Sequence, residues 1–407
     1  MRIIVQKFGG TSVATPAGRT RVADRVERAV RGGLATIVVV SAMGRRGDPY
    51  ATDTLIQLAN EACPDLAPRE MDLLLSCGEI IASVIMAGVL KARGLPVKVF
   101  TGGQAGICTD DTFGSARIQK LEPAALLSSL QEGKVAVVAG FQGVNEAGDV
   151  TTLGRGGSDT TAAALGGAVG AEVVEIFTDV DGVKTADPRL VPDARTMPVI
   201  TYDEIAQMAH HGAKVIDPRA VELAMQHSVP LRIKSTFDEG PGTQVTFSHE
   251  SGASCGELNS HNPVTGVTHV DGLAQLSVTT DSAQTATQSL FRLLAQAGIS
   301  VDLINVSPGN ATFCIDGRKA ERAVHLLTEA GMDPVVRAGC AKVSVVGAGM
   351  RGRPGVMAAV VDALVGGGIA ILQSADSHVT ISCLVESAAV QRAVQLLHDA
   401  FSLGTRA

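Results

Sequence analysis

Hydrophobic residues in the first 245 positions follow two alternating patterns. Longer segments repeat apolar residues at helical spacing, and short runs between them are apolar at nearly every position. The short runs, which are typical of strands buried on both faces, are Ile3–Gln6, Thr36–Val40, Val97–Phe100, Val135–Ala139 and Val173–Phe177. The helical segments are Arg19–Arg31, Asp53–Glu61, Ser76–Arg93 and Ser158–Val169. Strands that alternate with helices predict an α/β fold with a largely parallel sheet.

The polar, glycine-containing stretch from Phe237 to Asn262 predicts a boundary, and an internal repeat follows it. Arg322–Leu327 (RAVHLL) returns as Arg392–Leu397 (RAVQLL), 70 residues later. Each copy predicts strand, helix, strand, strand, helix, the pattern of a ferredoxin-like βαββαβ unit. The first copy gives Leu273–Thr279, Ser282–Ala297, Ile299–Val306, Ala311–Asp316 and Arg318–Ala330; the second gives Lys342–Val346, Pro354–Val365, Ile369–Gln373, Val379–Val385 and Ala388–Ala400. We therefore expect domains at 1–245, 264–337 and 338–407, with a linker at 246–263.

Composition limits the class of protein. With 407 residues, 45% of them hydrophobic and 18% charged, the chain can bury a large core. No uncharged apolar run reaches the roughly 18 residues of a membrane span, and nothing marks the N-terminus for export. The net charge of −7 argues against nucleic acid as a partner. Seven scattered cysteines without Cys-x-x-Cys spacing favour a reducing cytoplasm over a disulfide framework or a zinc site.

A lysine and two glycines follow the first predicted strand, in the run Lys7–Ser12 (KFGGTS). Glycines let backbone N–H groups approach an anion closely, and the lysine supplies a positive charge for phosphate. The spacing is not that of a Walker A loop. The run therefore indicates either a phosphate-binding turn of another type or a tight turn without a ligand.

A second glycine-rich run, Gly154–Thr161 (GRGGSDTT), precedes an alanine-rich helix. Ser158 or Asp159 can cap this helix, whose first N–H groups and positive dipole end then point toward an anion. Arg155 offers a bidentate fork for a carboxylate. A carboxylate beside an anion site, as at Asp159, indicates either a metal ion or a reorganising role between like charges.

A polar loop from Thr178 to Arg189 follows the strand Val173–Phe177. Because ligands of open α/β sheets bind at the carboxyl ends of strands, Lys184 and Arg189 are candidates for an anion site. A solvated turn is the alternative. Lys214 adds another positive charge, and Glu79 opens the predicted helix Ser76–Arg93.

Five runs, in this order, closely resemble the aspartokinase family: Lys7–Ser12, Ser41–Met43, Gly154–Asp159, Phe177–Val183 and Thr185–Arg189. The resemblance covers essentially the whole chain, the C-terminal repeat included. It implies an amino-acid-kinase catalytic fold followed by two ACT domains. It also implies ATP-dependent phosphorylation of L-aspartate to 4-phospho-L-aspartate, the step that starts synthesis of lysine, threonine, methionine and diaminopimelate.

The resemblance assigns site residues by position. The implied catalytic residues are Lys7 and Asp159. The implied aspartate-binding residues are Ser41, Thr52, Glu79, Arg155, Gly156, Gly157 and Ser158. The implied ATP-binding residues are Lys7, Gly9, Gly10, Thr178, Asp179, Lys184, Arg189 and Lys214; the family often has tyrosine at position 184. Mg²⁺ is expected to accompany ATP without a fixed protein ligand.

The chemistry of such a reaction agrees with these residue types. A substrate carboxylate is ionised at neutral pH, so its phosphorylation needs no general base. It does need positive charge between two anions and in-line alignment. We expect Lys7 to stabilise the transferring phosphoryl group and Asp159 to organise lysine and metal. Arg155 and Glu79 would bind the α-carboxylate and the ammonium group of aspartate.

The repeat half is expected to sense an amino acid. Met350, Pro354 and Gly355 lie at the N-terminus of a predicted helix, where an effector carboxylate could bind, and Gln373 is a further candidate. The resemblance implies lysine, threonine or diaminopimelate as effector, and the run Gln373–His378 is more similar to the diaminopimelate-sensitive members. It also implies a homo-oligomer formed through the ACT domains, and some members make the regulatory half as a separate subunit.

Two other functions stay open at the level of sequence. The same fold could phosphorylate another acceptor, as glutamate 5-kinase and uridylate kinase relatives do, although those lack the paired C-terminal module. The chain could also be a non-catalytic amino-acid-sensing regulator. The intact set of Lys7, Arg155 and Asp159 argues against that reading.

Overall fold

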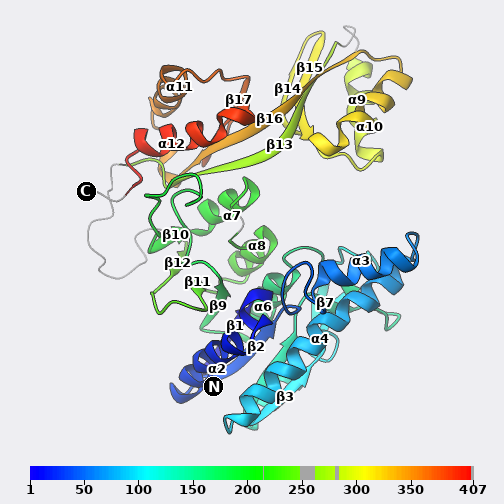
Figure 1. The fold of residues 1–407 in the computed structure, drawn as a ribbon, viewed down its shortest axis with the longest axis vertical. Coiled ribbons are helices and arrows are strands. Elements are labelled where there is room, and N and C mark those ends of the chain that lie inside the picture. The colour runs from blue at the N-terminus through cyan, green and yellow to red at the C-terminus, as the bar shows by residue number, and fades with distance from the viewer. Residues whose placement is uncertain (214, 248–261, 280–283, 405–407) are drawn as a thin grey trace. The chain divides into compact units, whose positions relative to one another are not determined.

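A computed structural model describes residues 1–213, 215–247, 262–279 and 284–404. The chain forms two compact units (Figure 1). The first comprises Met1–Val183, Thr196–Ala209 and Lys214–Cys255, and the second comprises Lys184–Arg195, His210–Ala213 and Gly256–Ala407. The second unit thus includes a short segment, 184–195, that precedes the predicted boundary by about 50 residues. The domain bounds expected from the sequence remain a proposal.

The first unit is built on a largely parallel sheet of eight strands. Five of its strands are those that the sequence predicts, and the pair β11–β12 is antiparallel. In sheet order the strands are β10 (Val199–Thr201), β12 (Thr243–Thr246), β11 (Leu231–Ser235), β9 (Val173–Thr178), β1 (Ile3–Phe8), β2 (Ala35–Val40), β6 (Val135–Ala139) and β3 (Val97–Phe100). The predicted α/β class is confirmed.

Helices cover this sheet, and a smaller sheet flanks it. Apolar residues of α2 and α4 form one core with β1, β2 and β6, and α6 contacts β1, β2 and β9. The helices are α1 (Gly10–Ala14), α2 (Pro16–Arg31), α3 (Thr52–Ala62), α4 (Pro68–Ala92), α5 (Ala124–Gln131), α6 (Gly157–Val169), α7 (Tyr202–His210) and α8 (Pro218–Gln226). The small sheet has the order β5 (Ile118–Leu121), β4 (Ile107–Thr109), β7 (Gln142–Val144) and β8 (Val150–Thr152).

Two predicted helix starts are wrong. The helix that Glu79 was expected to open begins at Pro68, because proline suits the first helical position. The buried carboxylate of Asp72, one turn further along, accepts N–H bonds from Gly114 and Thr152. Glu79 therefore lies in the middle of α4. Neither Ser158 nor Asp159 caps α6, because the N-cap is Gly156, which is in the left-handed conformation. Both residues lie in the first turn of α6 instead.

α4 is long and apolar enough to cross a membrane by length and composition alone. Its residues Ala82, Met86 and Leu90, however, are buried in the core of the first unit beside β2 and β6. The helix is thus accounted for as a core element of this α/β unit.

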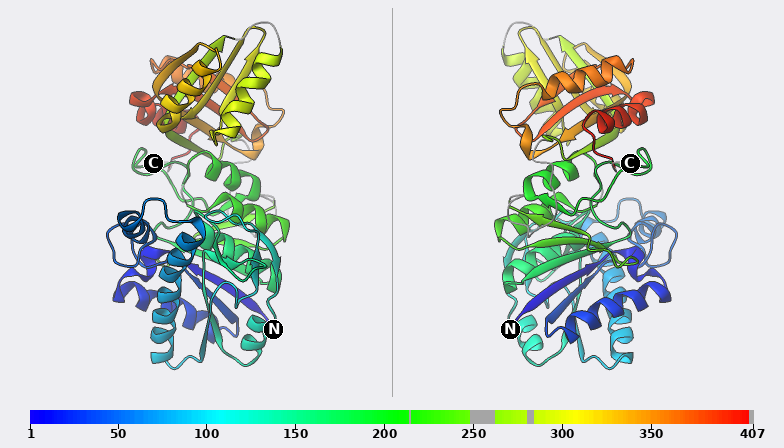
Figure 2. Two further views of the ribbon diagram at one scale, coloured as in Figure 1. Left: turned by 90° about the vertical axis from the view of Figure 1, so that its right-hand side faces the viewer. Right: turned by 90° about the vertical axis from the view of Figure 1, so that its left-hand side faces the viewer.

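The second unit is built on one six-stranded antiparallel sheet that both repeat copies share. Its order is β14 (Asp302–Ser307), β15 (Asn310–Asp316), β13 (Gly266–Thr279), β16 (Pro334–Val346), β18 (Thr380–Glu386) and β17 (Gln373–Asp376). α9 (Gln284–Gln296) and α10 (Ala320–Glu329) contribute to one core with β13 and β15. α11 (Val356–Gly366) and α12 (Val390–Ala400), orange and red in the right-hand view of Figure 2, form another core with β16 and β18.

The two copies are interleaved through the long strands β13 and β16. Gly266–Val270 pairs with Lys342–Val346, whereas Leu273–Val278 pairs with Pro334–Cys340. Each copy therefore receives its fourth strand: the first from 334–340, and the second from 266–270, which precede the first copy in the chain. The predicted strands at Ile299 and Ile369 begin later, at Asp302 and Gln373, because the N–H groups of both isoleucines donate to carbonyl oxygens of the preceding helices.

Candidate active site

The carboxyl ends of β1, β2 and β6 border a cavity of about 280 Å³ in the first unit. This is the edge of a parallel sheet where ligands bind in open α/β folds. The cavity brings together ten residues that the sequence selects and one that it does not, Phe141. Its lining residues are Lys7, Gly9, Gly10, Ser41, Thr52, Glu79, Phe141, Gly156, Gly157, Ser158 and Asp159.

An ion pair joins the two predicted catalytic residues. Nζ of Lys7, at the end of β1, lies 2.6 Å from Oδ1 of Asp159, in the first turn of α6. Both side chains are nearly buried, with 12% and 10% exposed. The pair holds one ammonium group in a defined position at the cavity wall, where it can meet an anion without being strongly screened by water.

Glu79 places a buried carboxyl group in the same wall. Its Oε1 accepts a hydrogen bond from the backbone N–H of Ala42 at 3.0 Å, and its Oε2 has no partner among the described residues. Burial raises the pKa of the Glu79 carboxyl to about 8, and the bond from Ala42 opposes this rise. A buried oxygen without a partner that faces a cavity is suited to a cationic ligand.

Glycine is required at two positions of the cavity wall. A Cβ at Gly10 would lie 2.5 Å from the carbonyl oxygen of Ala42, so only glycine permits this approach. Gly156 has a φ of 68°, and a Cβ there would lie 2.2 Å from Oδ2 of Asp217. Because no side chain caps α6, the first backbone N–H groups of this helix can donate to carbonyl oxygens of the preceding turn or to a ligand.

Three residues near the cavity escape the sequence analysis. Phe141, with a φ of 70°, lines the cavity after β6, and only its place after a buried strand hinted at it. Asp217 caps α8, and its N–H donates to Oδ2 of Asp159. Arg219 donates to the carbonyl oxygens of Leu153 and Arg155 and thereby clamps the turn before α6. The Asp217–Pro218 pair is a helix-start signal that could have located α8.

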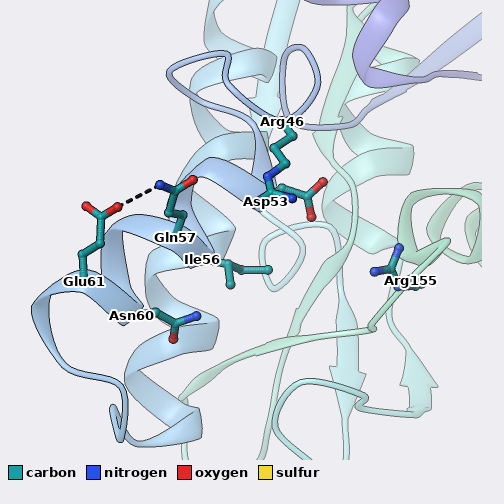
Figure 3. A pocket seen from close by; sticks show the side chains of 7 residues that line it. All are labelled: Arg46, Asp53, Ile56, Gln57, Asn60, Glu61 and Arg155. Atoms are coloured by element: carbon teal, nitrogen blue, oxygen red, sulfur yellow. Dashed lines mark hydrogen bonds between the residues drawn. The ribbon is translucent and has the colours of Figure 1, made fainter. Parts of the chain in front are cut away.

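Arg155 lines a different cavity, of about 550 Å³. Figure 3 shows its guanidinium group facing α3 across this cavity, with Arg46 and Asp53 near the first turn of the helix. Ile56, Gln57, Asn60 and Glu61 of α3 complete the lining. Arg155 is thus separated from the other proposed aspartate ligands in this conformation, although Gly156 and Gly157 next to it line the smaller cavity.

The predicted nucleotide contacts after β9 are divided between the two units. Thr178 donates to Asp179, and Asp179 forms an ion pair with Arg45 at 2.6 Å, within the first unit. Lys184 and Arg189 belong to the second unit, where Arg189 forms an ion pair with Asp187 at 2.6 Å. Lys214 lies outside the described residues. The roles of these five residues stay proposals.

Three of the proposed effector residues lie at or before the start of α11 in the second unit, and Gln373 begins β17. Gly355 is the N-cap of α11, has a φ of 93° and forms no side-chain cap, and Pro354 precedes it. Met350 is buried in the core below α11. Gln373 donates to the carbonyl oxygen of Leu303 and accepts from Gln275, so its amide group joins the two repeat copies.

Sequence comparisons identify the family. The profile of the amino acid kinase family matches residues 2–235, and that of an ACT domain matches residues 335–399. The chain is 49% identical to aspartokinase 1 of Bacillus subtilis over 404 residues, which cover 99% of this chain and 100% of the relative. The chain belongs to the aspartokinase family. It is also 40% identical to the aspartokinase of Mycolicibacterium smegmatis, over 99% of this chain and 97% of that one.

Solved aspartokinase structures have the same fold. The E. coli aspartokinase III complex with aspartate and ADP (R-state) superposes with a TM-score of 0.80 at 27% identity, over 98% of this chain and 99% of that one. The complex of the same enzyme with lysine and aspartate (T-state) has a TM-score of 0.75 at 26% identity, over 98% and 100%. The predicted aspartokinase family, amino-acid-kinase fold, ACT domains and kinase activity are thereby confirmed.

Proposed function

We propose that this aspartokinase transfers the γ-phosphoryl group of ATP to the side-chain carboxylate of L-aspartate. A carboxylate oxygen of aspartate forms the new P–O bond, the bond between the γ-phosphorus and the β,γ-bridging oxygen breaks, and ADP leaves with the electron pair. The products are 4-phospho-L-aspartate and ADP. The bound aspartate and ADP of E. coli aspartokinase III support this choice of substrates.

The observation that carries the proposal is one cavity that contains both a fixed ammonium group and a buried, unpaired carboxyl oxygen. Lys7 provides the ammonium group and Glu79 the oxygen. An amino acid that donates its own ammonium to Glu79 would point its side-chain carboxylate into a cavity that Lys7 borders. Lys7 would then lie where negative charge develops on the transferring group, which is the requirement of phosphoryl transfer.

The remaining groups fit supporting roles. We assign Ser41, Thr52, Ser158 and the amides of Gly156 and Gly157 to aspartate, and Gly9 and Gly10 to the phosphates of ATP. Asp159 keeps Lys7 oriented through their 2.6 Å contact. Arg155 is assigned to the α-carboxylate of aspartate, which requires its side chain to turn from the larger cavity toward the smaller one.

The residues present fit a magnesium ion that arrives with the nucleotide. The carboxylates that line the smaller cavity are Asp159, which Lys7 engages, and Glu79, whose pKa is about 8. Neither is a free anionic ligand at neutral pH, so the phosphates would hold the ion. Mg²⁺ would supply charge neutralisation between the phosphates, while Asp159 keeps the Lys7 ammonium group in place beside them.

The test is formation of an acyl phosphate. With ATP, Mg²⁺ and hydroxylamine, which traps acyl phosphates, we expect hydroxamate from L-aspartate and none from L-glutamate. Hydroxamate from glutamate at an equal rate would assign the chain to another carboxylate acceptor. Failure to bind nucleotide at all would favour the non-catalytic regulator instead.

We further propose that an amino acid bound near Met350, Pro354, Gly355 and Gln373 inhibits the reaction. E. coli aspartokinase III in its T-state contains lysine, and the sequence run at Gln373–His378 favours diaminopimelate here. Coupled ATP turnover with lysine, threonine and diaminopimelate, singly and in pairs, decides among them. Inhibition by lysine or threonine with no effect of saturating diaminopimelate would contradict the assignment.

A cytoplasmic location and a homo-oligomer formed through the ACT domains complete the proposal, together with a regulatory half translated separately as a second subunit. Light scattering of the purified chain measures the oligomer. Immunoblotting of the native host with an antibody to the C-terminal half detects a separate subunit, and a single full-length band would exclude one.

A further inference from the structure

The segment 184–195 is held in the second unit next to the end of the chain. Val191 and Ala194 are buried in one core with Leu397 and Leu403, and an antiparallel bridge joins Ala194 to Gly404. Residues more than 200 positions apart in the sequence therefore meet here, although the repeat pattern places only the later ones in this unit.

Three potential metal ligands meet at this junction. One carboxylate oxygen of Asp193, one imidazole nitrogen of His398 and one carboxylate oxygen of Asp399 all lie within 4.8 Å of one another. The two aspartates are exposed, whereas His398 is fully buried. No ion pair of either aspartate occurs among the described residues, so their mutual repulsion is not relieved by a cationic side chain in direct contact.

The imidazole of His398 is prepared for metal binding. Its Nε2 lies 3.0 Å from Oγ1 of the buried Thr185, and its Nδ1 has no hydrogen-bond partner within the described part of the chain. A ligating histidine commonly hydrogen-bonds through its other ring nitrogen, which fixes the tautomer. The unpartnered Nδ1 is therefore the ring nitrogen that a cation at this junction would meet.

The nearby positive charge is directed elsewhere. Arg195 also acts on His398 electrostatically, but its Nε donates to the carbonyl oxygen of Leu403 at 3.1 Å. Its backbone N–H donates to Oγ1 of Thr185. Arg195 therefore supports the arrangement of Thr185 and the chain end around His398.

We propose that Asp193, His398 and Asp399 bind one divalent first-row cation, such as Mn²⁺ or Zn²⁺, with Nδ1 of His398 and one oxygen from each carboxylate as ligands. One imidazole with two carboxylates suits these ions better than Mg²⁺ or Ca²⁺, which take oxygen ligands almost exclusively. Water would complete the coordination sphere. The ion would fasten the segment 184–195 to α12, because its ligands come from both.

The test is a titration of the full-length protein with Mn²⁺ alone, without nucleotide, in which electron paramagnetic resonance measures the free ion. We expect one bound Mn²⁺ per chain, displaced by Zn²⁺. Asp193→Asn should weaken binding by about tenfold or more, and so should Asp399→Asn. Both replaced residues are exposed, so these variants should fold even if a variant of the buried His398 does not.

Asp362→Asn is the matched control, because Asp362 is an exposed aspartate on α11 in the same unit. It removes the same charge and should leave Mn²⁺ binding unchanged. Saturating Mn²⁺ should also raise the Tm of the unaltered protein and of the control by more than it raises that of Asp193→Asn. The proposal is overturned if the unaltered protein binds no Mn²⁺, or if Asp193→Asn and Asp399→Asn bind it as tightly as the control.

Discussion

The buried carboxyl of Glu79 predicts a pH dependence of both substrate binding and stability. With a pKa of about 8, only about one tenth of this group is ionised at pH 7. If the ammonium group of aspartate binds the ionised form, the apparent KM for aspartate at pH 7 is about tenfold above its value at high pH. Binding of aspartate should also release close to one proton per site at pH 7, because the bound ammonium lowers the pKa of Glu79 again.

The effect on stability has the opposite sign from that of a salt-bridged carboxylate. The folded-state pKa of Glu79 is raised from 4.5 to about 8, so folding retains a proton that the unfolded chain gives up. As the pH rises from 4.5 to about 8, the unfolded chain loses this proton while the folded protein keeps it, so the free energy of unfolding falls progressively. The total loss is at most roughly 5 kcal/mol above pH 8. Replacing Glu79 by glutamine removes the ionisable group and thus this loss.

Glu79→Gln should therefore be more stable than the unaltered protein at pH 8.5, while it binds aspartate poorly at every pH. The assay combines denaturant unfolding at pH 6 and 8.5 with calorimetric titration of aspartate in two buffers of different ionisation enthalpy, which counts released protons. Glu146→Gln, at an exposed position of the first unit, is the control and should change neither result. A KM for aspartate that is constant from pH 6.5 to 8.5, or unimpaired aspartate binding by Glu79→Gln, would refute the reasoning.

Three further predictions concern Lys7 and the turn before α6. Lys7→Ala should reduce kcat at least about 100-fold with an unchanged circular dichroism spectrum; near-normal turnover would remove Lys7 from the mechanism. Gly156→Ala should lower the free energy of unfolding by more than Gly33→Ala does. Gly33 also has a positive φ, but a Cβ there would meet no atom within 4 Å, so this control should cost about 1–2 kcal/mol. Equal losses would show that the Asp217 contact is unimportant. Arg219→Gln should raise the KM for aspartate more than the KM for ATP, and Arg219→Lys should partly restore it. Arg117→Gln, at an exposed position, is the control. A change in Tm alone would limit Arg219 to a structural role.

Some of the predicted cavity residues lie at the ends of strands that the sequence defines clearly. Lys7 and Ser41 follow runs of buried β-branched residues, and a parallel sheet brings such ends to one edge. The local pattern marks Glu79 only as a helix-start residue, eight residues after the true start of α4, and its aspartate-binding role is what the family resemblance implies. Its central position in the helix explains its burial, which is what raises its pKa.

The groups that were missed depend on contacts that no local pattern encodes. Arg219 is an ordinary helix-start residue until the fold brings its guanidinium to the carbonyl oxygens of Leu153 and Arg155, more than 60 positions earlier. Phe141 holds a left-handed backbone conformation that is unusual for its residue type, so the sequence gives no reason to expect it. In each case the role of the residue depends on the groups around it in the fold and not on its own residue type.

The same limit applies to the repeat half. A period of 70 residues shows that two equivalent units exist, but it does not tell which strand completes which unit. The glycine at position 272, with a φ of 71°, and the bulges around Leu273 divide β13 into two parts that pair with opposite ends of β16. Val267 consequently joins the core of α11 and α12, and Leu276 joins that of α9 and α10. One continuous strand thus serves both cores, so the two repeat copies share the backbone hydrogen bonds between β13 and β16.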